Sequence, residues 1–312
     1  MMNGKRLLIS HIADEDGITP VILSKLVFKD IEFILVNPEE TSKCYLENVD
    51  NYDFVYITDL NISEELAAKI DKDDTLKSKT LIFDHHKSNM VLNKYDFITV
   101  ITLKNNRKEC ATSIFYEYLC SISDNEILHK ESTRGLTEQV RIIDTYDFKS
   151  KEDEGAHKLG LLFSILGRDN FIDYFDKYIR CHDVFEYTEK EEFLIKLEKD
   201  RMDNYLSQKK DEVMRVNIDG YKTMVVYAER YRSELGNYLV NLYNDIDFSV
   251  IINVSRGVSY RGAGKVDLSV FASKYGGGGH MDASGNSIPS DLLKNITKLI
   301  FKNVYFEEDE NE

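Results

Sequence analysis

The sequence lacks any run of 18 or more apolar residues, which is the length that a transmembrane helix needs. Its first ten residues, MMNGKRLLIS, lack the apolar core and the small-residue cleavage site of a signal peptide. Cysteine is also scarce, with four residues in 312, and no pair has the CxxC spacing of a zinc ribbon. We therefore expect a cytoplasmic protein that keeps four reduced thiols in its core and does not contact a membrane.

Positive charge is outweighed, because 40 Lys and Arg residues stand against 55 Asp and Glu residues, giving a formal net charge of −15. Tight non-specific binding to a long duplex needs many cationic contacts with phosphates, so this balance argues against such a partner. A few arginines and metal ions can still hold a small phosphorylated ligand on an acidic protein. The length suits two domains of ordinary size.

Short apolar segments alternate with segments of helical periodicity in the first 150 residues. Most residues of these short segments are apolar, so both faces of a strand would be apolar, which predicts buried parallel strands. The strands are expected at Arg6–Ser10, Glu32–Val36, Phe54–Thr58, Thr80–Phe83 and Phe97–Ile101, and helices at Ile18–Phe28, Ser63–Asp71 and Ala111–Leu119. This order predicts an α/β fold with a doubly wound, mostly parallel sheet.

The remainder of the chain is predicted to hold a helical region and then a smaller α/β domain. Residues 133–213 have an almost wholly helical pattern, and the charged stretch 189–212 contains neither Gly nor Pro, which favours a solvated connecting helix. Strands follow at Val213–Ile218, Thr223–Tyr227 and Phe248–Val254, with a helix at Glu234–Tyr243. We therefore divide the chain into a metal-binding catalytic domain (1–185), a helical linker (186–212) and a substrate-binding domain (213–312).

Acidic residues and histidines follow three of the predicted strands. They are His11, Asp14 and Asp16 after the first strand, Asp59 after the third, and Asp84, His85 and His86 at the end of the fourth. Ligands of open α/β sheets bind outside the carboxyl ends of the strands, so these side chains are expected to converge. Each motif alone can be read as a polar loop, a helix cap or a surface pair, but their conjunction favours a metal site.

The proposed ligands are oxygen and imidazole groups without thiolate, which suits Mn²⁺, and Mg²⁺ less well, with Co²⁺ as a further option. Two ions about 3.5–4 Å apart can share a carboxylate and activate a water molecule. The segment VRIIDTYD adds Asp144 or Asp147 as a further ligand of the second ion, and we favour Asp144.

A run of four glycines followed by His280 stands out in the second domain, in the sequence YGGGGHMDASG. A flexible linker is the simplest reading of four glycines, but a linker is not usually followed at once by His and then by Ala-Ser-Gly. The backbone N–H groups of such a loop can form an anion-binding nest, and His280 can donate to a phosphate. Upstream, the segment SYRG supplies Arg261, which is either a bidentate phosphate ligand or a surface residue in a turn.

Together these motifs resemble those of the DHH phosphoesterase superfamily, named for its Asp-His-His motif, over nearly the whole chain. The resemblance implies that His11, Asp14 and Asp59 hold one Mn²⁺, and that Asp16, Asp59, His85 and Asp144 hold the other. It implies that His86, beside Asp84, acts on the scissile phosphate or the leaving group. It also implies that a terminal phosphate or nucleotide is bound by Arg261, Gly277, Gly278, Gly279 and His280.

Within that superfamily, the size and the segment Val140–Phe148 look most like the nanoRNases, which degrade short oligonucleotides to mononucleotides. The hypothesis is therefore a two-metal phosphodiesterase acting on short oligonucleotides or dinucleotides. Its rivals are a 3′-phosphoadenosine 5′-phosphate phosphatase, a linear or cyclic dinucleotide phosphodiesterase, and an inactive nucleotide-binding sensor. The sequence leaves open a homodimer, the choice between RNA and DNA, and the direction of degradation.

Overall fold

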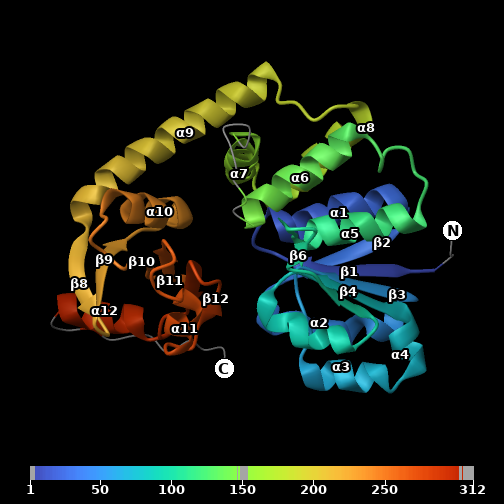
Figure 1. Ribbon diagram of the computed structural model, residues 1–312, viewed down its shortest axis with the longest axis horizontal. Coiled ribbons are helices and arrows are strands. Elements are labelled where there is room, and N and C mark those ends of the chain that lie inside the picture. The colour runs from blue at the N-terminus through green and yellow to red at the C-terminus, as the bar shows by residue number, and fades with distance from the viewer. Residues whose placement is uncertain (1–3, 146, 148–153, 302–303, 305–312) are drawn as a thin grey trace. The chain divides into compact units, whose positions relative to one another are not determined.

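The computed structural model describes residues 4–145, 147, 154–301 and 304 of the chain. The chain forms two compact units, Met1–Glu198 and Lys199–Glu312, each with its own sheet and core (Figure 1). The predicted long charged helix is α9, Glu189–Lys209, and it is continued by a short 3₁₀ turn, Lys210–Glu212. Because α9 begins in the first unit and ends in the second, it is the segment that joins them.

The first unit is built on a five-stranded parallel sheet in the order β2-β1-β3-β4-β5. Its strands are β1 (Arg6–His11), β2 (Ile31–Val36), β3 (Phe54–Thr58), β4 (Thr80–Asp84) and β5 (Ile98–Val100). Helices cover both faces, with α1 (Glu15–Val27) and α5 (Ala111–Ile122) on one face and α2 (Thr41–Asn48), α3 (Glu64–Asp71) and α4 (Asp74–Lys79) on the other (Figure 1). The predicted doubly wound α/β architecture is therefore confirmed.

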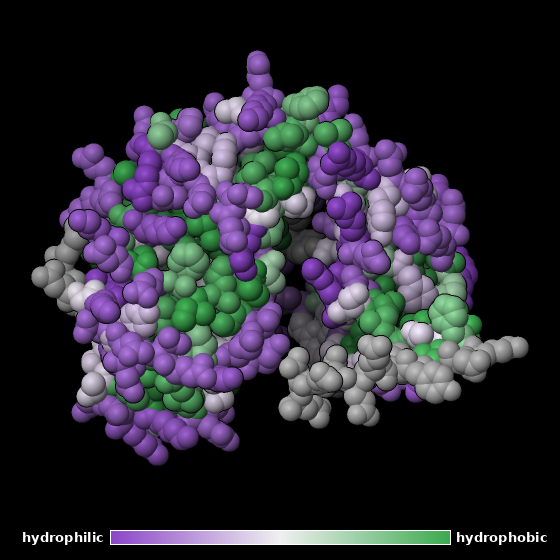
Figure 2. All heavy atoms as spheres, turned by 180° about the vertical axis from the view of Figure 1, so that it is seen from behind, coloured by the Kyte–Doolittle hydropathy of each residue, from purple (hydrophilic) through white to green (hydrophobic). Residues whose placement is uncertain are grey.

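The central strands bury side chains on both faces, as their apolar pattern predicts. On β1, Leu8 joins the core beneath α1 and α5, while Leu7 and Ile9 join the core on the opposite face. The edge strand β2 differs, because it pairs with β1 alone and leaves Phe33 39% exposed. The prediction of a buried strand there was wrong in this respect, since the sequence pattern carries no information on strand order. Figure 2 shows apolar side chains gathered on the surface of this unit among polar ones.

Helices follow the sheet, as predicted for residues 133–213. They are α6 (Glu131–Thr145), α7 (Glu154–Leu166) and α8 (Arg168–Cys181), and a small hairpin of β6 (Leu103–Lys104) and β7 (Arg107–Lys108) precedes them. Of the segment Val140–Phe148, residues 146 and 148 lie outside the described residues. All four thiols are free, but Cys181 at the end of α8 is exposed, so the prediction of four core thiols was wrong for this residue. Among the described residues, no helix combines the length and apolar character needed to cross a membrane.

The second unit holds a six-stranded sheet in the order β12-β13-β11-β10-β9-β8. The strands are β8 (Met214–Ile218), β9 (Tyr221–Tyr227), β10 (Phe248–Asn253), β11 (Gly257–Gly262), β12 (Gly278–Gly279) and β13 (Ala283–Asn286). The helices are α10 (Arg232–Leu242), α11 (Leu268–Ser273) and α12 (Leu292–Ile300). Leu235 and Leu239 of α10 pack on one face of the sheet, and Phe271 of α11 packs on the other. The predicted strands and the helix α10 are present, whereas β11, β13 and α11 were not predicted.

Candidate metal centre

Three neighbouring strands of the first unit bring the predicted ligands to one edge of the sheet. β1 ends at His11, β3 is followed directly by Asp59, and β4 ends at Asp84 and is followed by His85 and His86. Because β1, β3 and β4 are adjacent and parallel, their carboxyl ends lie together. The convergence that the sequence predicts is therefore present in the structure.

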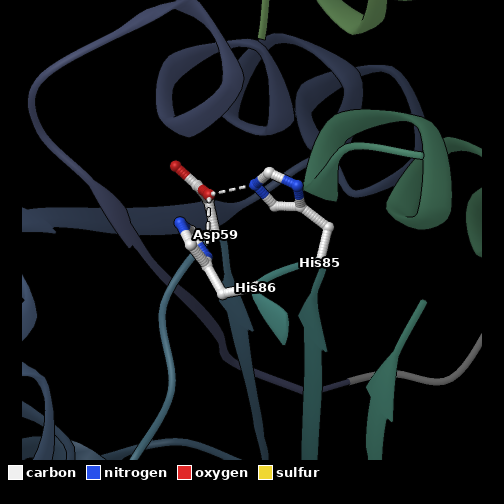
Figure 3. Close-up of side chains that lie close together, drawn as sticks. All are labelled: Asp59, His85 and His86. Atoms are coloured by element: carbon white, nitrogen blue, oxygen red, sulfur yellow. Dashed lines mark ion pairs between the residues drawn. The ribbon is translucent and has the colours of Figure 1, made fainter. Parts of the chain in front are cut away.

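Asp59 lies at the centre of this cluster and is only 4% exposed. Its Oδ2 atom lies 3.2 Å from Nδ1 of His11, while its Oδ1 atom lies 3.3 Å from Nε2 of His85 and 3.9 Å from Nδ1 of His86. Figure 3 shows both imidazoles of the β4 loop turned toward this carboxylate. The backbone of Asp59 adopts φ 57°, a left-handed conformation that few residues other than Gly tolerate and that Asp adopts more readily than most. The two carboxylate oxygens of Asp59 are thus presented to different partners.

The nitrogen and oxygen atoms of the cluster form three groups in which every ligand atom lies within 4.8 Å of the others. The groups are His11, Asp14 and Asp59; Asp59, His85 and His86; and Asp16, His85 and Asp144. Asp59 and His85 each belong to two groups, and of the two only the carboxylate of Asp59 has two oxygens with which to bind two ions. A pure imidazole and carboxylate set suits a divalent cation such as Mn²⁺.

Two buried oxygen atoms support the fit of a cation. Oδ1 of Asp59 and Oδ2 of Asp144 receive no hydrogen bond from a described residue, although nitrogens of His85 lie 3.3 and 3.4 Å away. Buried carboxylate oxygens without donors are costly unless a cation compensates them. The residues present therefore fit divalent metal ions.

Asp14 and Asp16 are held by the starts of two helices. Asp14 caps α1, where its carboxylate accepts a hydrogen bond from the N–H of Gly17 at 3.0 Å and lies 3.4 Å from His11. A Cβ atom at Gly17 would lie 2.2 Å from the carbonyl oxygen of His11, which confirms that this tight turn needs glycine. Asp16 accepts the N–H groups of Ala111 and Thr112 at the start of α5, both at 2.8 Å. The support of Asp16 by α5 was not predicted.

Asp84 is the most completely hydrogen-bonded carboxylate described in the cluster. Its Oδ1 accepts from the backbone N–H of His85 at 2.7 Å, the backbone N–H of His86 at 3.2 Å and Nδ1 of His86 at 2.8 Å. Its Oδ2 accepts from the side-chain amides of Asn61 at 3.1 Å and Asn89 at 2.6 Å. Asp84 belongs to none of the three ligand groups among the described residues. Its contacts therefore orient the loop and the ring of His86.

Two asparagines that make these contacts with Asp84 were not predicted as site residues from the sequence. Asn61 lies two residues after Asp59, and Asn89 lies three residues after His86. Their closeness to the motifs was the available signal, since the groups that orient metal ligands often come from the same loops.

The two candidate aspartates, Asp144 in the last turn of α6 and Asp147 just after the helix, have different partners. Asp144 lies 3.4 Å from Nδ1 of His85 and belongs to a ligand group. Asp147 instead accepts a hydrogen bond from Nη1 of Arg141 at 3.0 Å. Arg141 is in turn paired with Glu138. The structure thus places Asp144, the favoured candidate, in the cluster.

Burial and mutual repulsion disturb the pKa values of the carboxyl groups in the cluster. Burial raises the pKa of Asp16 to about 6, and the charge of Asp59 adds to this rise. Burial also holds the pKa of Asp144 well above its usual value. Burial opposes ionisation of Asp59 too, but the neighbouring rings of His11 and His85 outweigh it and keep its pKa below the ordinary value. The cluster therefore stabilises Asp59 as an anion in spite of its burial.

The histidines respond in the opposite sense. Burial works to lower the pKa of His11, but its two neighbouring carboxylates raise it to about 10. The pKa of His85 is likewise raised well above its usual value by three carboxylates, against the effect of burial. A raised pKa means that a proton competes with a divalent cation for the ligating nitrogen, so metal affinity is expected to rise with pH.

The glycine run of the second unit forms β12 and the turn that precedes it. The N–H of Gly276 donates to the carbonyl oxygen of Ser273 at 3.2 Å, and the N–H of Gly277 donates to that of Ala272 at 2.9 Å. The N–H of His280 donates to the carbonyl oxygen of Ala283 at 2.8 Å. These three N–H groups are therefore already engaged in hydrogen bonds within the second unit, and β12 itself pairs with β13. His280 is exposed.

Comparisons with known proteins support the architecture and place the chain among nucleases. No family model matches the sequence. The sequence is 32% identical over 297 residues to oligoribonuclease NrnB of Bacillus subtilis, covering 92% of this chain and 74% of that protein. It is 24% identical to a 3′,5′-cyclic-nucleotide phosphodiesterase of Helicobacter pylori, covering 90% of this chain and 92% of that protein.

A solved structure supports the fold independently of sequence. The DHH domain of a member of the s1p family of ribosomal proteins superposes with a TM-score of 0.60 at 14% identity. The match covers 95% of this chain and 86% of that one. At this identity the likeness supports the fold alone.

Proposed function

This chain belongs to the DHH phosphoesterase family, together with oligoribonuclease NrnB, and we propose that it hydrolyses short oligonucleotides to mononucleotides at a centre of two divalent ions. The reaction is cleavage of a phosphodiester bond, which makes the protein a hydrolase. Its substrates are oligonucleotides of a few residues or dinucleotides. Long duplexes are disfavoured as substrates by the net charge of −15.

The observation that carries this proposal is the position of Asp59, whose two oxygens face His11 and His85 at 3.2 and 3.3 Å. Two metal ions lie close together when one carboxylate binds both of them, and Asp59 faces two ligand groups as such a carboxylate must. When bound, the two ions supply Lewis-acid stabilisation of the phosphoryl oxygens and lower the pKa of a water molecule toward about 7. The ion that best matches the nitrogen and oxygen ligands is Mn²⁺.

The side chains of the cluster take different roles in this proposal. One ion would be held by His11, Asp14 and Asp59, and the other by Asp16, Asp59, His85 and Asp144. His86 would contact the phosphate that is cleaved, because it lies beside Asp59 and is more exposed than His85. Asp84 would act through His86, since its hydrogen bonds fix the orientation of that ring.

The second unit is proposed to bind the substrate through Arg261, Gly277, Gly278, Gly279 and His280. We keep the functional division into a catalytic part (1–185), a linker (186–212) and a substrate-binding part (213–312). We also propose that the protein works in the cytoplasm and can form a homodimer.

The proposal is tested by product analysis on end-labelled oligonucleotides of 2 to 24 residues in the presence of Mn²⁺. We expect the dinucleotide and the oligonucleotides of a few residues to be converted to mononucleotides, while the 24-mer persists. RNA and DNA series labelled at either end would reveal the preferred sugar and the direction of degradation. Persistence of the dinucleotide at saturating Mn²⁺ would show that the proposed function is wrong and would favour an inactive nucleotide sensor.

A second candidate function is hydrolysis of a cyclic nucleotide or dinucleotide. It is favoured by the likeness to the Helicobacter pylori phosphodiesterase, which extends over 92% of that protein. Parallel assays with 3′,5′-cyclic AMP, a cyclic dinucleotide and 3′-phosphoadenosine 5′-phosphate separate this candidate from the first. If any of these compounds is turned over faster than a linear dinucleotide, this second candidate replaces oligonucleotide hydrolysis as the preferred function.

Gly278 offers a test of the glycine loop as a substrate contact. A Cβ atom at Gly278 meets no heavy atom within 4 Å, so the fold itself does not require glycine there. Gly278→Ala should therefore unfold at the wild-type temperature, yet raise the KM for a dinucleotide roughly tenfold if the substrate backbone approaches this strand closely.

Gly279→Ala makes the same change at a neighbouring glycine that the fold does require, and so shows what a structural effect looks like. Gly279 has φ 134°, and its added Cβ would lie 2.7 Å from the carbonyl oxygen of Ala283. Unlike Gly278→Ala, this variant should lose about 1–3 kcal/mol of stability from strain and crowding. An unchanged KM in Gly278→Ala would remove this loop from the substrate site.

A further inference from the structure

The carboxylate of Asp144 differs from other acidic groups of the candidate metal centre in how it is held. Asp16 and Asp84 accept hydrogen bonds from backbone N–H groups. Oδ2 of Asp144 is buried as well, yet it receives no hydrogen bond from a described residue. Asp144 lies in the last turn of α6, which ends at Thr145. The contacts that fix this last turn therefore decide where the carboxylate of Asp144 is presented.

Arg141, one helical turn before Asp144, fixes that turn from the side of the helix. Its side chain is only 4% exposed. Its Nε and Nη2 atoms donate to the two carboxylate oxygens of Glu138 at 3.0 and 2.7 Å. Its Nη1 donates to Oδ2 of Asp147 at 3.0 Å and to the backbone carbonyl oxygen of Lys108 at 2.9 Å. The planar guanidinium thus joins the end of α6 to the strand β7 with directional hydrogen bonds.

Lys108 makes a second contact with the same helical turn. Its Nζ donates to the backbone carbonyl oxygen of Thr145 at 2.9 Å. The last carbonyl groups of a helix have no partner within the helix, and a cation is favourable at this end of the helix dipole. Lys108 therefore holds the end of α6 at two points, through its carbonyl group and through its side chain.

The segment that begins at Lys108 reaches Asp16 within four residues. The N–H groups of Ala111 and Thr112 donate to the carboxylate of Asp16, both at 2.8 Å. The hydroxyl group of Thr112 donates to the backbone carbonyl oxygen of Asp16 at 2.9 Å. Between these contacts, Glu109 is 3% exposed and its carboxylate accepts a hydrogen bond from a serine of α5 at 2.7 Å. One short, well-anchored segment therefore contacts Asp16 at one end and the last turn of α6 at the other.

We propose that Arg141 is a positioning residue, which acts through Lys108 to set the distance between Asp144 and Asp16 and thereby forms the site of the ion that these two carboxylates share. Groups that orient metal ligands commonly change metal affinity by 10- to 100-fold when they are lost. The other ion site is built on the ends of β1 and β3 and does not involve this segment. The inference rests on the proposed metal centre, but not on the identity of the substrate.

Metal binding by the full-length protein tests the inference without turnover. The protein is freed of metal with EDTA and titrated with Mn²⁺ by calorimetry, and bound manganese per chain is measured after equilibrium dialysis. We expect the wild type to bind two ions. Arg141→Gln should bind one ion with wild-type affinity and the other roughly tenfold or more weakly. Arg141→Lys, which keeps the charge but not the planar fork, should fall between the wild type and Arg141→Gln.

The dependence of turnover on Mn²⁺ gives a second readout that separates positioning from a general loss of structure. At limiting Mn²⁺, Arg141→Gln should have a much lower kcat for a dinucleotide than the wild type. At saturating Mn²⁺, its kcat should recover toward the wild-type value, because the weakened site is then filled by mass action. A distorted fold would lower kcat at every concentration of Mn²⁺.

Lys108→Met is a milder variant that keeps the inference testable if Arg141→Gln does not fold. The side chain of Lys108 is exposed, and the substitution removes its bond to Thr145 while keeping the backbone carbonyl group that Arg141 contacts. It should weaken the same single ion by a smaller factor, roughly threefold. Thermal unfolding of the metal-free variants confirms that each of them is folded.

Arg180→Gln is the matched control. Arg180 on α8 also pairs with a carboxylate one turn earlier, that of Asp176, and also donates to a backbone carbonyl oxygen of another element, that of Lys25. Lys25 lies in the last turn of α1, whereas Asp14 of the metal centre caps the first turn of the same helix. The control should therefore bind two ions as the wild type does.

Three results would overturn the inference. They are fewer than two Mn²⁺ ions in the wild type, equal weakening of both ions in Arg141→Gln, and unchanged binding in Lys108→Met together with any folded Arg141→Gln. A different result bears on the proposed function alone. If the wild type binds two ions and the variants lose one selectively, but no oligonucleotide is hydrolysed, the proposed function fails and the role of Arg141 remains.

Discussion

Replacing Asp59 with Asn is expected to reduce kcat/KM for a dinucleotide in the presence of Mn²⁺ by on the order of 10⁴-fold or more. Asp59 belongs to two ligand groups and faces both His11 and His85, so its loss affects both ion positions together. Asn is chosen instead of Ala because it tolerates the left-handed backbone at φ 57°. Steady-state kinetics and elemental analysis of bound metal measure the two consequences.

Asp96→Asn supplies the control for this prediction. Asp96 is 72% exposed and pairs with Lys77 on the surface, so the variant makes the same change of charge away from the cluster. It should retain wild-type kinetics and metal content. Wild-type turnover in Asp59→Asn, in a folded protein, would refute the assignment of Asp59 as the shared ligand.

Asp84→Asn is expected to lower the free energy of unfolding by about 3 kcal/mol and to reduce turnover strongly. Asp84 is fully buried, and its carboxylate accepts five hydrogen bonds, from His85, His86, Asn61 and Asn89. An amide can accept at only one of its two ends, so its NH₂ group would face donors and leave buried groups unsatisfied. Urea denaturation measures the loss of stability, and kinetics measure the effect of the misplaced His86.

Asn89→Ala provides the graded comparison. It removes a single donor to Asp84 and leaves the carboxylate in place, so it should cost about 1 kcal/mol and affect turnover less. A loss of stability in Asp84→Asn no greater than that in Asn89→Ala would show that the Asp84 network does not stabilise this loop.

The parts of the centre that the sequence predicted share one property, which is that local pattern and strand topology suffice to place them. Asp59 and Asp84-His85-His86 follow apolar segments, and parallel strands end at the same edge of a sheet. The position of each motif along its own strand therefore fixed where its side chains meet. The structure also accounts for the preference for Asp144 over Asp147, because Asp144 lies beside His85 whereas Asp147 is paired with Arg141.

The features that were missed depend on partners distant in the sequence. The carboxylate of Asp16 is held by backbone groups of α5 that lie 95 and 96 residues away. The exposure of β2 follows from its place at the sheet edge, which its apolar pattern does not encode.

The doubly wound architecture and the meeting of the acidic and histidine motifs follow from the local pattern, because periodicity and strand-end motifs are properties of residues close together in the sequence. The support and the charge state of these side chains follow from the packing of separate elements. Hydrogen bonds to Asp84 and the start of α5 at Asp16 join residues distant in the sequence, and electrostatic energy depends on distance in space.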